Sequence, residues 1–513
     1  MKKIMILGAG IYQVPLIRTA RRMGLYTIVV SIPGDYPGFA LADKIYELNT
    51  RDKEAILAAA EKEQIDGICT SGTDVAVSTI GYVCEKMHLS GIPYEAAEIL
   101  TDKAKMKDAF RQGGVSAADG MRVRSAEEAQ KAAEQLGYPV VVKRVDSSGS
   151  RGITVVEHSG QIEEAYENAR NGSARDYVLV EKFLRGTEIG VDGFVQNHKL
   201  VFLAPHTKFV YRGAHTTVPV GHAFPYGCSG ALREEIARQM QLAVTASGAD
   251  QCSVNADVFV DGEKVWIIEM GGRTGATCIP ELISTYYGFD FYEQMIKSAL
   301  GEETDFQQTE SCPCMAKLLL SPVSGTITQI DRDQVERLRQ EGLELVLDYP
   351  EGHEVSAMAD GTDRIGHVIV KTDREAELDE QMKRVYRCIW IDGKNLETIS
   401  GRENSKIKKP GIVFKTSEEE RKDSGFCVAR HINIRWTNFD YTGFYRLHHH
   451  PIVDWNQQCN RTEPGKRCAS VLHTLNRGAV DGEKAEQEVE RRFDRQECIG
   501  VMVRIRDFAR KAW

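Results

Sequence analysis

Two carboxylates twelve positions apart, Asp257 and Glu269, lie in apolar stretches that are typical of the two strands of a hairpin. A carboxylate in an apolar strand costs free energy unless a partner compensates for lost hydration, and a hard divalent cation is a suitable partner. Because side chains alternate along strands, the loop length decides which residues share a face. We expect a three-residue loop, 261–263, which places both acids and Asn255 on one face. An ordinary hairpin whose acids face water is the alternative interpretation.

Upstream, a short apolar strand, 138–143, ends at Lys143 and is followed by a loop of small residues, 147–152, and a second strand. The N–H groups of such a loop can cover phosphates while the lysine supplies a positive charge. A plain hairpin with an exposed lysine is the alternative. A further strand, 177–184, could offer main-chain groups to a flat base, and Glu188 beyond it could accept hydrogen bonds from ribose hydroxyls.

A helix is predicted over 102–112, with Thr101 as its N-cap and two glycines after its end. Lys103 and Lys107 fall one turn apart on one face of this helix. A solvated basic stripe is the alternative interpretation of the pair. Farther along the chain, Lys208 and Arg212 are weak candidates for substrate binding.

The order of these parts, from Asp102-Lys103 to the segment Glu269–Arg273, resembles the ATP-grasp superfamily, and within it the carboxylate–amine ligase branch, over residues 1 to about 400. The resemblance implies ATP, magnesium (manganese as a substitute), and Asp257 and Glu269 as metal ligands. It implies catalytic roles for Lys143 and Arg273, the arginine contacting an acyl-phosphate or a substrate carboxylate. A structural salt bridge is the alternative role for the arginine. The implied nucleotide-binding residues are Lys103, Lys143, Ser147, Ser148, Gly149, Gly152, Glu181, Lys182, Phe183, Leu184 and Glu188.

One position departs from the family pattern. Members commonly carry Asn two residues after the second metal carboxylate, whereas this chain has Gly271 there. Water or Asn255 could replace the missing ligand, because magnesium keeps several waters. Without a replacement, one magnesium site would be weakened.

The 513 residues exceed a single hydrophobic core, so several domains are expected. Strands alternate with helices at the N-terminus, which predicts a parallel sheet. Gly8-Ala-Gly10 follows the first strand, but Gln13 replaces the third glycine of the dinucleotide fingerprint, which disfavours a Rossmann oxidoreductase. The expected α/β architecture has an N-terminal parallel α/β (pre-ATP-grasp) domain over 1–100, a two-part ATP-grasp core that binds nucleotide and metal over 101–305, and a small C-terminal α+β domain over 306–400.

The composition changes after about residue 400. Residues 401–513 carry 22 Lys and Arg against 16 Asp and Glu, whereas residues 1–400 carry 43 against 58. No apolar periodicity persists in the tail, so no fold is predicted for it. An appended module and a basic segment for a partner remain alternatives to a disordered or off-frame extension, which we favour.

Twelve cysteines without regular spacing and a start with four apolar residues before Gly8 predict a cytoplasmic protein without a membrane segment. The expected partners are small-molecule carboxylate and amine substrates and a second copy in a homodimer, with no nucleic acid. The combined interpretation is an ATP-dependent carboxylate–amine (or thiol) ligase that acts through an acyl-phosphate and releases ADP and phosphate. A bicarbonate-using carboxylase of the same fold and a nucleotide-binding regulator with a decayed metal site are the alternatives.

Overall fold

The computed structural model contains the predicted α/β architecture, with a parallel sheet at the N-terminus and antiparallel sheets after it. The chain divides into two units, 1–413 and 414–513, and all of the second unit lies outside the described residues. The predictions for the tail therefore stay predictions. The structure describes residues 1–147, 152–212, 217–358, 363–400 and 407–408.

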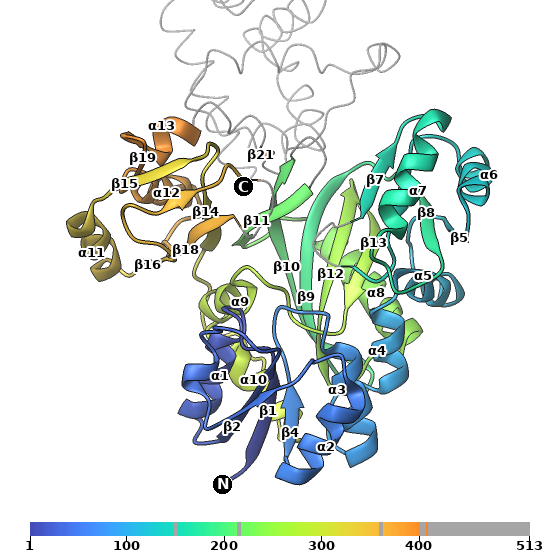
Figure 1. Ribbon diagram of the computed structural model, residues 1–513, viewed down its shortest axis with the longest axis horizontal. Helices are drawn as coiled ribbons and strands as arrows, with labels where there is room; N and C mark the ends of the chain where they lie inside the picture. Colours follow the sequence, from blue (N-terminus) through green and yellow to red (C-terminus); the bar gives the residue numbers. More distant parts are fainter. Residues whose placement is uncertain (148–151, 213–216, 359–362, 401–406, 409–513) are drawn as a thin grey trace, which may run out of the picture. The chain divides into compact units, whose positions relative to one another are not determined.

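The N-terminal region forms a parallel sheet in the order β3-β2-β1-β4, as the alternating pattern predicted (Figure 1). The central strands are almost continuous apolar runs because parallel strands are covered on both faces. The elements are β1 (Lys3–Leu7), α1 (Val14–Arg22), β2 (Tyr26–Ser31), η1 (Phe39–Leu41), β3 (Lys44–Glu47), α2 (Lys53–Glu63), β4 (Gly67–Cys69), α3 (Val77–Met87) and α4 (Tyr94–Leu100).

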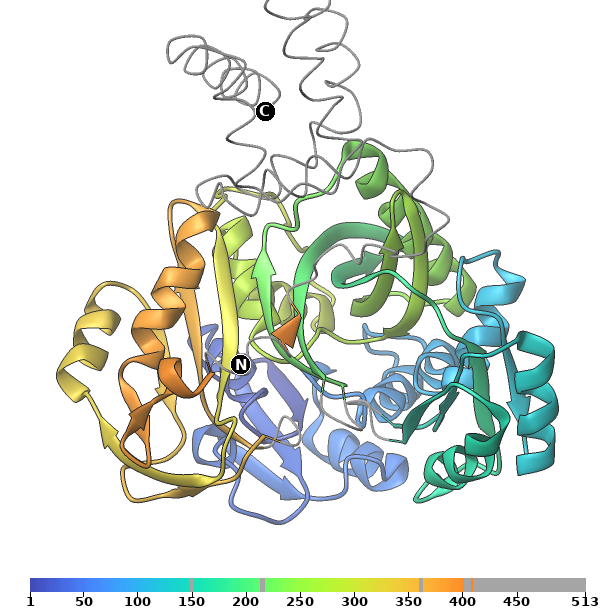
Figure 2. The ribbon, with the colours of Figure 1, turned by 90° about the horizontal axis from the view of Figure 1, so that it is seen from above.

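A second sheet, which we call the small sheet, has the antiparallel order β5-β8-β6-β7. Helices α6 and α7 pack together against this sheet, and their alanine-rich inner faces allow close contact with its valines (Figure 1, Figure 2). The elements are α5 (Lys103–Gln112), β5 (Gly120–Val123), α6 (Ala126–Leu136), β6 (Val140–Lys143), β7 (Ile153–Val156), η2 (Ser159–Gln161), α7 (Ile162–Arg170) and β8 (Val178–Lys182).

The longest sheet, the long sheet, runs β13-β12-β9-β10-β11-β14-β18-β16, and β21 pairs with β10. Helix α8 packs against β10 and β13, while α10 contacts β12 of this sheet and β4 of the N-terminal sheet. Its strands and helices are β9 (Thr187–Gln196), β10 (Lys199–Arg212), β11 (Thr217–Phe224), α8 (Gly230–Ser247), β12 (Cys252–Asp261), β13 (Lys264–Gly271), α9 (Ile279–Tyr287), α10 (Phe291–Ala299), β14 (Cys314–Leu320), β16 (Glu344–Leu347), β18 (Arg364–Lys371) and β21 (Ile407–Lys408).

The remaining elements form a short sheet, β17-β15-β19-β20, with three helices that share one hydrophobic core. Because β14 and β18 lie in the long sheet although they follow position 305, the predicted boundary between 305 and 306 stays a prediction. No helix among the described residues is long and apolar enough to cross a membrane. The elements are β15 (Gly325–Ile330), α11 (Arg332–Gln340), β17 (Glu354–Val355), η3 (Glu375–Glu377), α12 (Leu378–Tyr386), β19 (Ile389–Ile391), β20 (Lys394–Asn395) and α13 (Leu396–Ser400).

Candidate active site

The long sheet carries a row of acids on one face of β9, β12 and β13. Asp257 lies directly opposite Glu269 on β13 and opposite Gly190 on β9. Because alternate residues of a strand share a face, Glu188 on β9 lies on the same side as the two acids. The two predicted metal ligands therefore share one face, as expected, and a third carboxylate accompanies them.

The hairpin reaches this arrangement by an unexpected route. The predicted three-residue loop is wrong: Asp261 pairs with Lys264, so the turn has two residues. A regular ladder from this turn would place Asp257 and Glu269 on opposite faces. The register shifts by one residue next to Asp257, and the additional residue on β13 is Ile268. This β-bulge returns the second acid to the face of the first.

Lys208 on β10 lies between two of these acids. Its Nζ is 2.6 Å from Asp257 Oδ1 and 2.8 Å from Glu188 Oε1, and its side chain is 6 % exposed. Burial lowers the pKa of Lys208, but Asp257 and Glu188 outweigh burial and raise it overall. Burial raises the pKa of Asp257, and Lys208 only partly opposes this effect. Lys208, a weak candidate in the sequence, is thus a charged member of the site, whereas the side chain of Arg212 lies outside the described residues.

Lys103 at the start of α5 contacts the other metal-ligand candidate. Its Nζ lies 2.9 Å from Glu269 Oε2 and donates a hydrogen bond of 2.6 Å to the main-chain oxygen of Ser147. Burial raises the pKa of Glu269, but Lys103 outweighs burial and lowers it to about 2. The lysine therefore links the end of the predicted phosphate loop to the acidic face.

The N-cap residue of α5 directly precedes Lys103, the first residue of the helix, and helps to fix its position. The prediction of Thr101 as N-cap is wrong: the Asp102 carboxylate accepts hydrogen bonds from two N–H groups of the first turn. Asp102 is fully buried and also accepts a hydrogen bond of 2.6 Å from the Tyr177 hydroxyl. Asp102 thus contacts both the helix and Tyr177, which directly precedes β8, whereas the Thr101 hydroxyl donates a hydrogen bond of 2.7 Å to the Ala97 carbonyl of α4.

The small sheet brings a second set of charges together. Glu181 on β8 is buried and forms ion pairs with Lys143 of β6 and with Lys107 of α5, whose Nζ lies 3.0 Å from Glu181 Oε1. Burial raises the pKa of Glu181, but the two lysines outweigh burial and lower it. Burial lowers the pKa of Lys107, whose side chain is 5 % exposed. The alternative interpretation of Lys103 and Lys107 as a solvated stripe is therefore wrong.

The predicted phosphate loop is described only at its ends. Ser148 and Gly149 lie outside the described residues, so their phosphate contacts stay predictions. Gly152 has a φ of +69°, in the left-handed region that favours glycine. Its carbonyl accepts a hydrogen bond of 2.8 Å from the N–H of Arg144, which closes the base of the loop.

The segment predicted to hold adenine, Glu181 to Leu184, leaves the small sheet at the end of β8. The N–H of Lys182 donates to the Asp119 carbonyl at 2.9 Å, and the N–H of Phe183 donates to the Pro139 carbonyl at 3.2 Å. An N–H group that already donates is not available to a base. Hydrogen bonds to a nucleotide base would therefore come from the other main-chain groups of this segment.

Arg273, just after β13, lies in a network of polar side chains. Its Nη2 is 2.7 Å from Asp74 Oδ2, and its Nη1 donates a hydrogen bond of 3.1 Å to Asn255 Oδ1. Asn255 Nδ2 in turn donates to Asp192 Oδ2 at 2.7 Å, and the buried Asp192 also accepts from the N–H of Gly275 at 2.9 Å. The salt bridge considered as the alternative role of Arg273 is present, and it does not exclude a substrate contact because the guanidinium lines a cavity.

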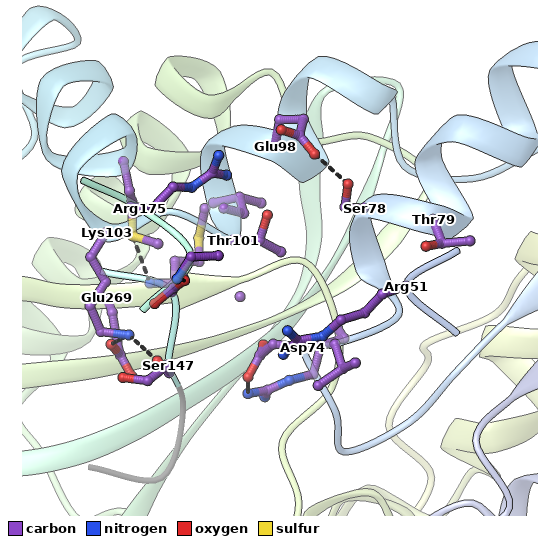
Figure 3. Close-up of a pocket in the computed structure, with 18 of the residues that line it drawn as sticks. Arg51, Asp74, Ser78, Thr79, Glu98, Thr101, Lys103, Ser147, Arg175 and Glu269 are labelled. Carbon is purple, nitrogen blue, oxygen red and sulfur yellow. Dashed lines mark hydrogen bonds and ion pairs between the residues drawn. The ribbon is translucent and has the colours of Figure 1, made fainter. Parts of the chain in front are cut away.

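This cavity has a volume of about 320 Å³. Figure 3 shows Lys103, Glu269 and Ser147 together on one side of it and Asp74 with Arg51 on another. Charges of both signs therefore surround a space large enough for a small polar molecule. The charged lining residues are Arg51, Lys53, Asp74, Glu98, Lys103, Asp146, Arg175, Glu269 and Arg273.

Comparisons with known proteins match this arrangement. Residues 102–306 match the family model "Carbamoyl-phosphate synthase L chain, ATP binding domain", and residues 317–392 match "L-amino acid ligase C-terminal domain 2". The crystal structure of phosphoribosylglycinamide synthetase from Anaerococcus prevotii is 28 % identical, with a TM-score of 0.64 over 77 % of this chain and 100 % of that chain. The chain belongs to the ATP-grasp superfamily.

Other ATP-grasp relatives agree. The formate-dependent phosphoribosylglycinamide formyltransferase of Methanocaldococcus jannaschii is 26 % identical over 300 residues, which cover 55 % of this chain and 72 % of that protein. The L-amino acid ligase of Bacillus licheniformis shares the fold at 18 % identity, with a TM-score of 0.64 over 77 % of this chain and 99 % of that chain. Within the ATP-grasp superfamily the chain is an ATP-dependent ligase of the carboxylate–amine branch, which forms C–N bonds.

The donor set of this ATP-grasp site fits magnesium. Asp257 and Glu269 are hard oxygen donors that face each other across adjacent strands. Within the described part of the chain, no group of three or more His, Cys, Asp or Glu residues could hold a metal by itself. One or two carboxylates completed by substrate phosphates and water are the usual magnesium environment in nucleotide enzymes.

The ATP-grasp site also contains residues that sequence reasoning did not select. Asp192 could have been found, because Glu188, Gly190 and Asp192 alternate with apolar residues along one strand. Asp74 comes from the loop between β4 and α3, which no local pattern connects to the hairpin. Lys107 had the right helical spacing, but spacing alone does not distinguish a buried lysine from an exposed one.

Proposed function

We propose that this ATP-grasp ligase uses ATP to activate the carboxylate of a small polar substrate and transfers the acyl group to an amine. The observation that carries the proposal is the opposed pair Asp257 and Glu269, with Glu188 on the same face. Partly buried acids arranged in this way suit a divalent cation that carries phosphates. The lysines that form ion pairs with Glu181 and Glu269 supply the positive charge that binds phosphates.

The proposed reaction has two steps. An oxygen of the substrate carboxylate attacks the γ-phosphorus of ATP and ADP leaves, which forms an acyl-phosphate. The amine nitrogen then attacks the carbonyl carbon, loses a proton and expels phosphate. No protein nucleophile is required, so the protein acts by positioning and by electrostatic stabilisation.

Each charged group has a role in these steps. Lys103 and Lys143 neutralise the transferring phosphates, and the N–H groups of the loop 147–152 orient them. Asp257 and Glu269 would hold magnesium, which when bound would supply positive charge to the phosphate oxygens. Arg273 holds the substrate carboxylate through its guanidinium fork.

We propose that the substrate that carries the carboxylate is an amino acid. Both signs of charge line the cavity, where the guanidinium of Arg273 lies 2.7 Å from the carboxylate of Asp74. A zwitterion matches such a wall better than an apolar acid does, because each charge finds a partner. The match of residues 317–392 to an L-amino acid ligase domain supports the same substrate class.

A phosphate-release screen tests the proposal. The full-length protein with Mg-ATP is offered single amino acids, pairs of amino acids and amines, or bicarbonate, and ADP, phosphate and the amide product are measured. We expect ADP, phosphate and amide in equal amounts with an amino acid and an amine. ADP release that requires bicarbonate would indicate a carboxylase instead. ATP binding without hydrolysis under any of these conditions would indicate a nucleotide-binding regulator.

A further inference from the structure

Gly271 is the position at which the chain departs from the ATP-grasp pattern, and it lies on the same face of β13 as Glu269. The space above this glycine is filled by the side chain of Asp74, which comes from the loop between β4 and α3. A Cβ atom at position 271 would lie 2.9 Å from Asp74 Oδ1. A side chain at 271 and the Asp74 carboxylate therefore compete for one place.

Asp74 is held in this place from two sides. Its Oδ2 accepts a hydrogen bond of 2.7 Å from Arg273 Nη2, and its main-chain oxygen accepts a hydrogen bond of 3.2 Å from the N–H of Val77 at the start of α3. Among the described residues, no hydrogen-bond donor contacts Oδ1 of Asp74. The carboxylate therefore presents one oxygen to the cavity while the other anchors it.

Asp74 shares its cavity with residues of the metal side. Asp74, Lys103 and Glu269 all line this cavity, and Lys103 Nζ lies 2.9 Å from Glu269 Oε2. Asn255, the replacement ligand considered from sequence, is less suitable, because Oδ1 accepts from Arg273 at 3.1 Å and Nδ2 donates to Asp192 at 2.7 Å.

We propose that Asp74 Oδ1 supplies the metal-side oxygen that the side chain at position 271 supplies in the resembled family. This inference rests on the proposed function, since it concerns the magnesium–nucleotide site of that reaction. The ligand set is then divided between two sheets, Glu269 on the long sheet and Asp74 after β4 of the N-terminal sheet. Metal binding would consequently join the N-terminal region to the hairpin.

The experiment measures Mn²⁺ binding to the full-length protein with ADP, by calorimetry and by the electron paramagnetic resonance signal of free Mn²⁺. Asp74→Ala is expected to weaken Mn²⁺ binding by roughly tenfold or more. Gly271→Asn is expected to weaken it as well, because the new side chain collides with Asp74. The double variant Asp74→Ala/Gly271→Asn, which carries the family pattern, is expected to regain most of the lost affinity.

Two further variants separate metal binding from structural support. Asp74→Asn keeps an oxygen acceptor for Arg273 but loses the charge, so it should bind Mn²⁺ more weakly, and its thermal midpoint without metal measures the separate loss of the Arg273 ion pair. Glu54→Gln, which removes an exposed acid of the same region, should bind Mn²⁺ like the parent protein.

The outcomes distinguish the inference from the proposed function. Unchanged Mn²⁺ affinity in Asp74→Ala and Asp74→Asn, with normal binding by the parent protein, would overturn the inference and leave the proposed function intact. A double variant that binds no more tightly than Asp74→Ala would also overturn it. A parent protein that binds no Mn²⁺ with ADP would overturn both.

Discussion

The small sheet carries a buried cluster of charges and the long sheet a partly buried one, and the two clusters have opposite compositions. In the small sheet one acid, Glu181, contacts two lysines, Lys107 and Lys143. In the long sheet one lysine, Lys208, contacts two acids. Each cluster therefore carries one unbalanced charge, positive in the small sheet and negative in the long sheet.

This difference shows how one protein can bind a ligand that carries both positive and negative charge. A buried ion pair already loses hydration, and an additional unpaired charge is tolerated when a ligand or solvent supplies the opposite charge. The positive cluster suits nucleotide phosphates, and the negative cluster suits the cation that accompanies them. Four predictions test this comparison.

The largest expected effect is on catalysis. Lys143→Met removes the positive excess of the small sheet, and Glu269→Gln removes a carboxylate from the metal face. Each change should lower the rate of ADP release by about 100- to 1000-fold at saturating Mg-ATP, because each removes charge aimed at the reacting phosphates. The exposed Lys131→Met on α6 is the matched control. Near-normal turnover by either site variant would contradict its role.

The second prediction compares the lysines of the two clusters. Lys208→Met leaves Glu188 and Asp257 together without a cation, so the free energy of unfolding should fall by about 3 kcal/mol. Lys107→Met should lower it less, since Glu181 keeps Lys143. Urea unfolding measures both, and added Mg²⁺ should stabilise the Lys208 variant more than the Lys107 variant, because only the former has two acids left without a cation. Equal losses in the two variants would remove the distinction between the clusters.

A buried acid without a lysine provides the third test. Glu281 in α9 accepts a hydrogen bond of 3.1 Å from the Tyr292 hydroxyl, and burial raises the pKa of Glu281 from 4.5 to about 7. A raised pKa in the folded state means that the bound proton stabilises the fold. This contribution is complete below the unfolded pKa and is lost as the pH rises through the folded value.

Glu281→Gln mimics the protonated form and should remove this dependence. At about pH 8 the variant should be more stable than the parent protein by up to about 3 kcal/mol, with little difference near pH 4. Urea unfolding at several pH values measures the effect. A variant that is less stable at every pH would show that the carboxylate, not the proton, is needed there.

The smallest expected effect concerns the backbone under the acidic face. A Cβ at Gly190 would lie 2.0 Å from the ring of His206, whose Nε2 contacts Asp192 at 3.1 Å. Gly190→Ala should therefore lower stability by about 1–3 kcal/mol through overpacking. Gly227→Ala, at a position without neighbours within 4 Å, is the control in thermal unfolding. Equal midpoints for the two variants would show that the ring moves without cost.

Local patterns predicted the elements well. The strand that ends at Lys143, the helix that carries Lys103 and the parallel N-terminal sheet all form. Apolar runs and alternation are local properties, so the sequence contains them. The N-cap was harder, because Thr101 and Asp102 are both good caps and only the burial of Asp102 beside Tyr177 favours the aspartate.

The charged contacts of the site followed no local rule. Lys208 and Asp74 are distant in sequence from the hairpin. The order of the long sheet brings Lys208 of β10 to it, whereas Asp74 reaches it from the loop after β4 of the N-terminal sheet. The bulge at Ile268 was equally inaccessible, because two loop lengths fit the same alternation until the whole ladder is formed.

The sequence by itself determined the chemistry available to this protein: acids and lysines at the ends and on the faces of apolar strands, in an order that resembles the ATP-grasp superfamily. Side-chain type and strand periodicity are encoded residue by residue. The tertiary structure alone decided how these charges are paired, with two lysines on Glu181, two acids on Lys208, and Asp74 above Gly271. Pairing depends on distances of a few ångströms between separate elements, and those distances exist only after the sheets have packed.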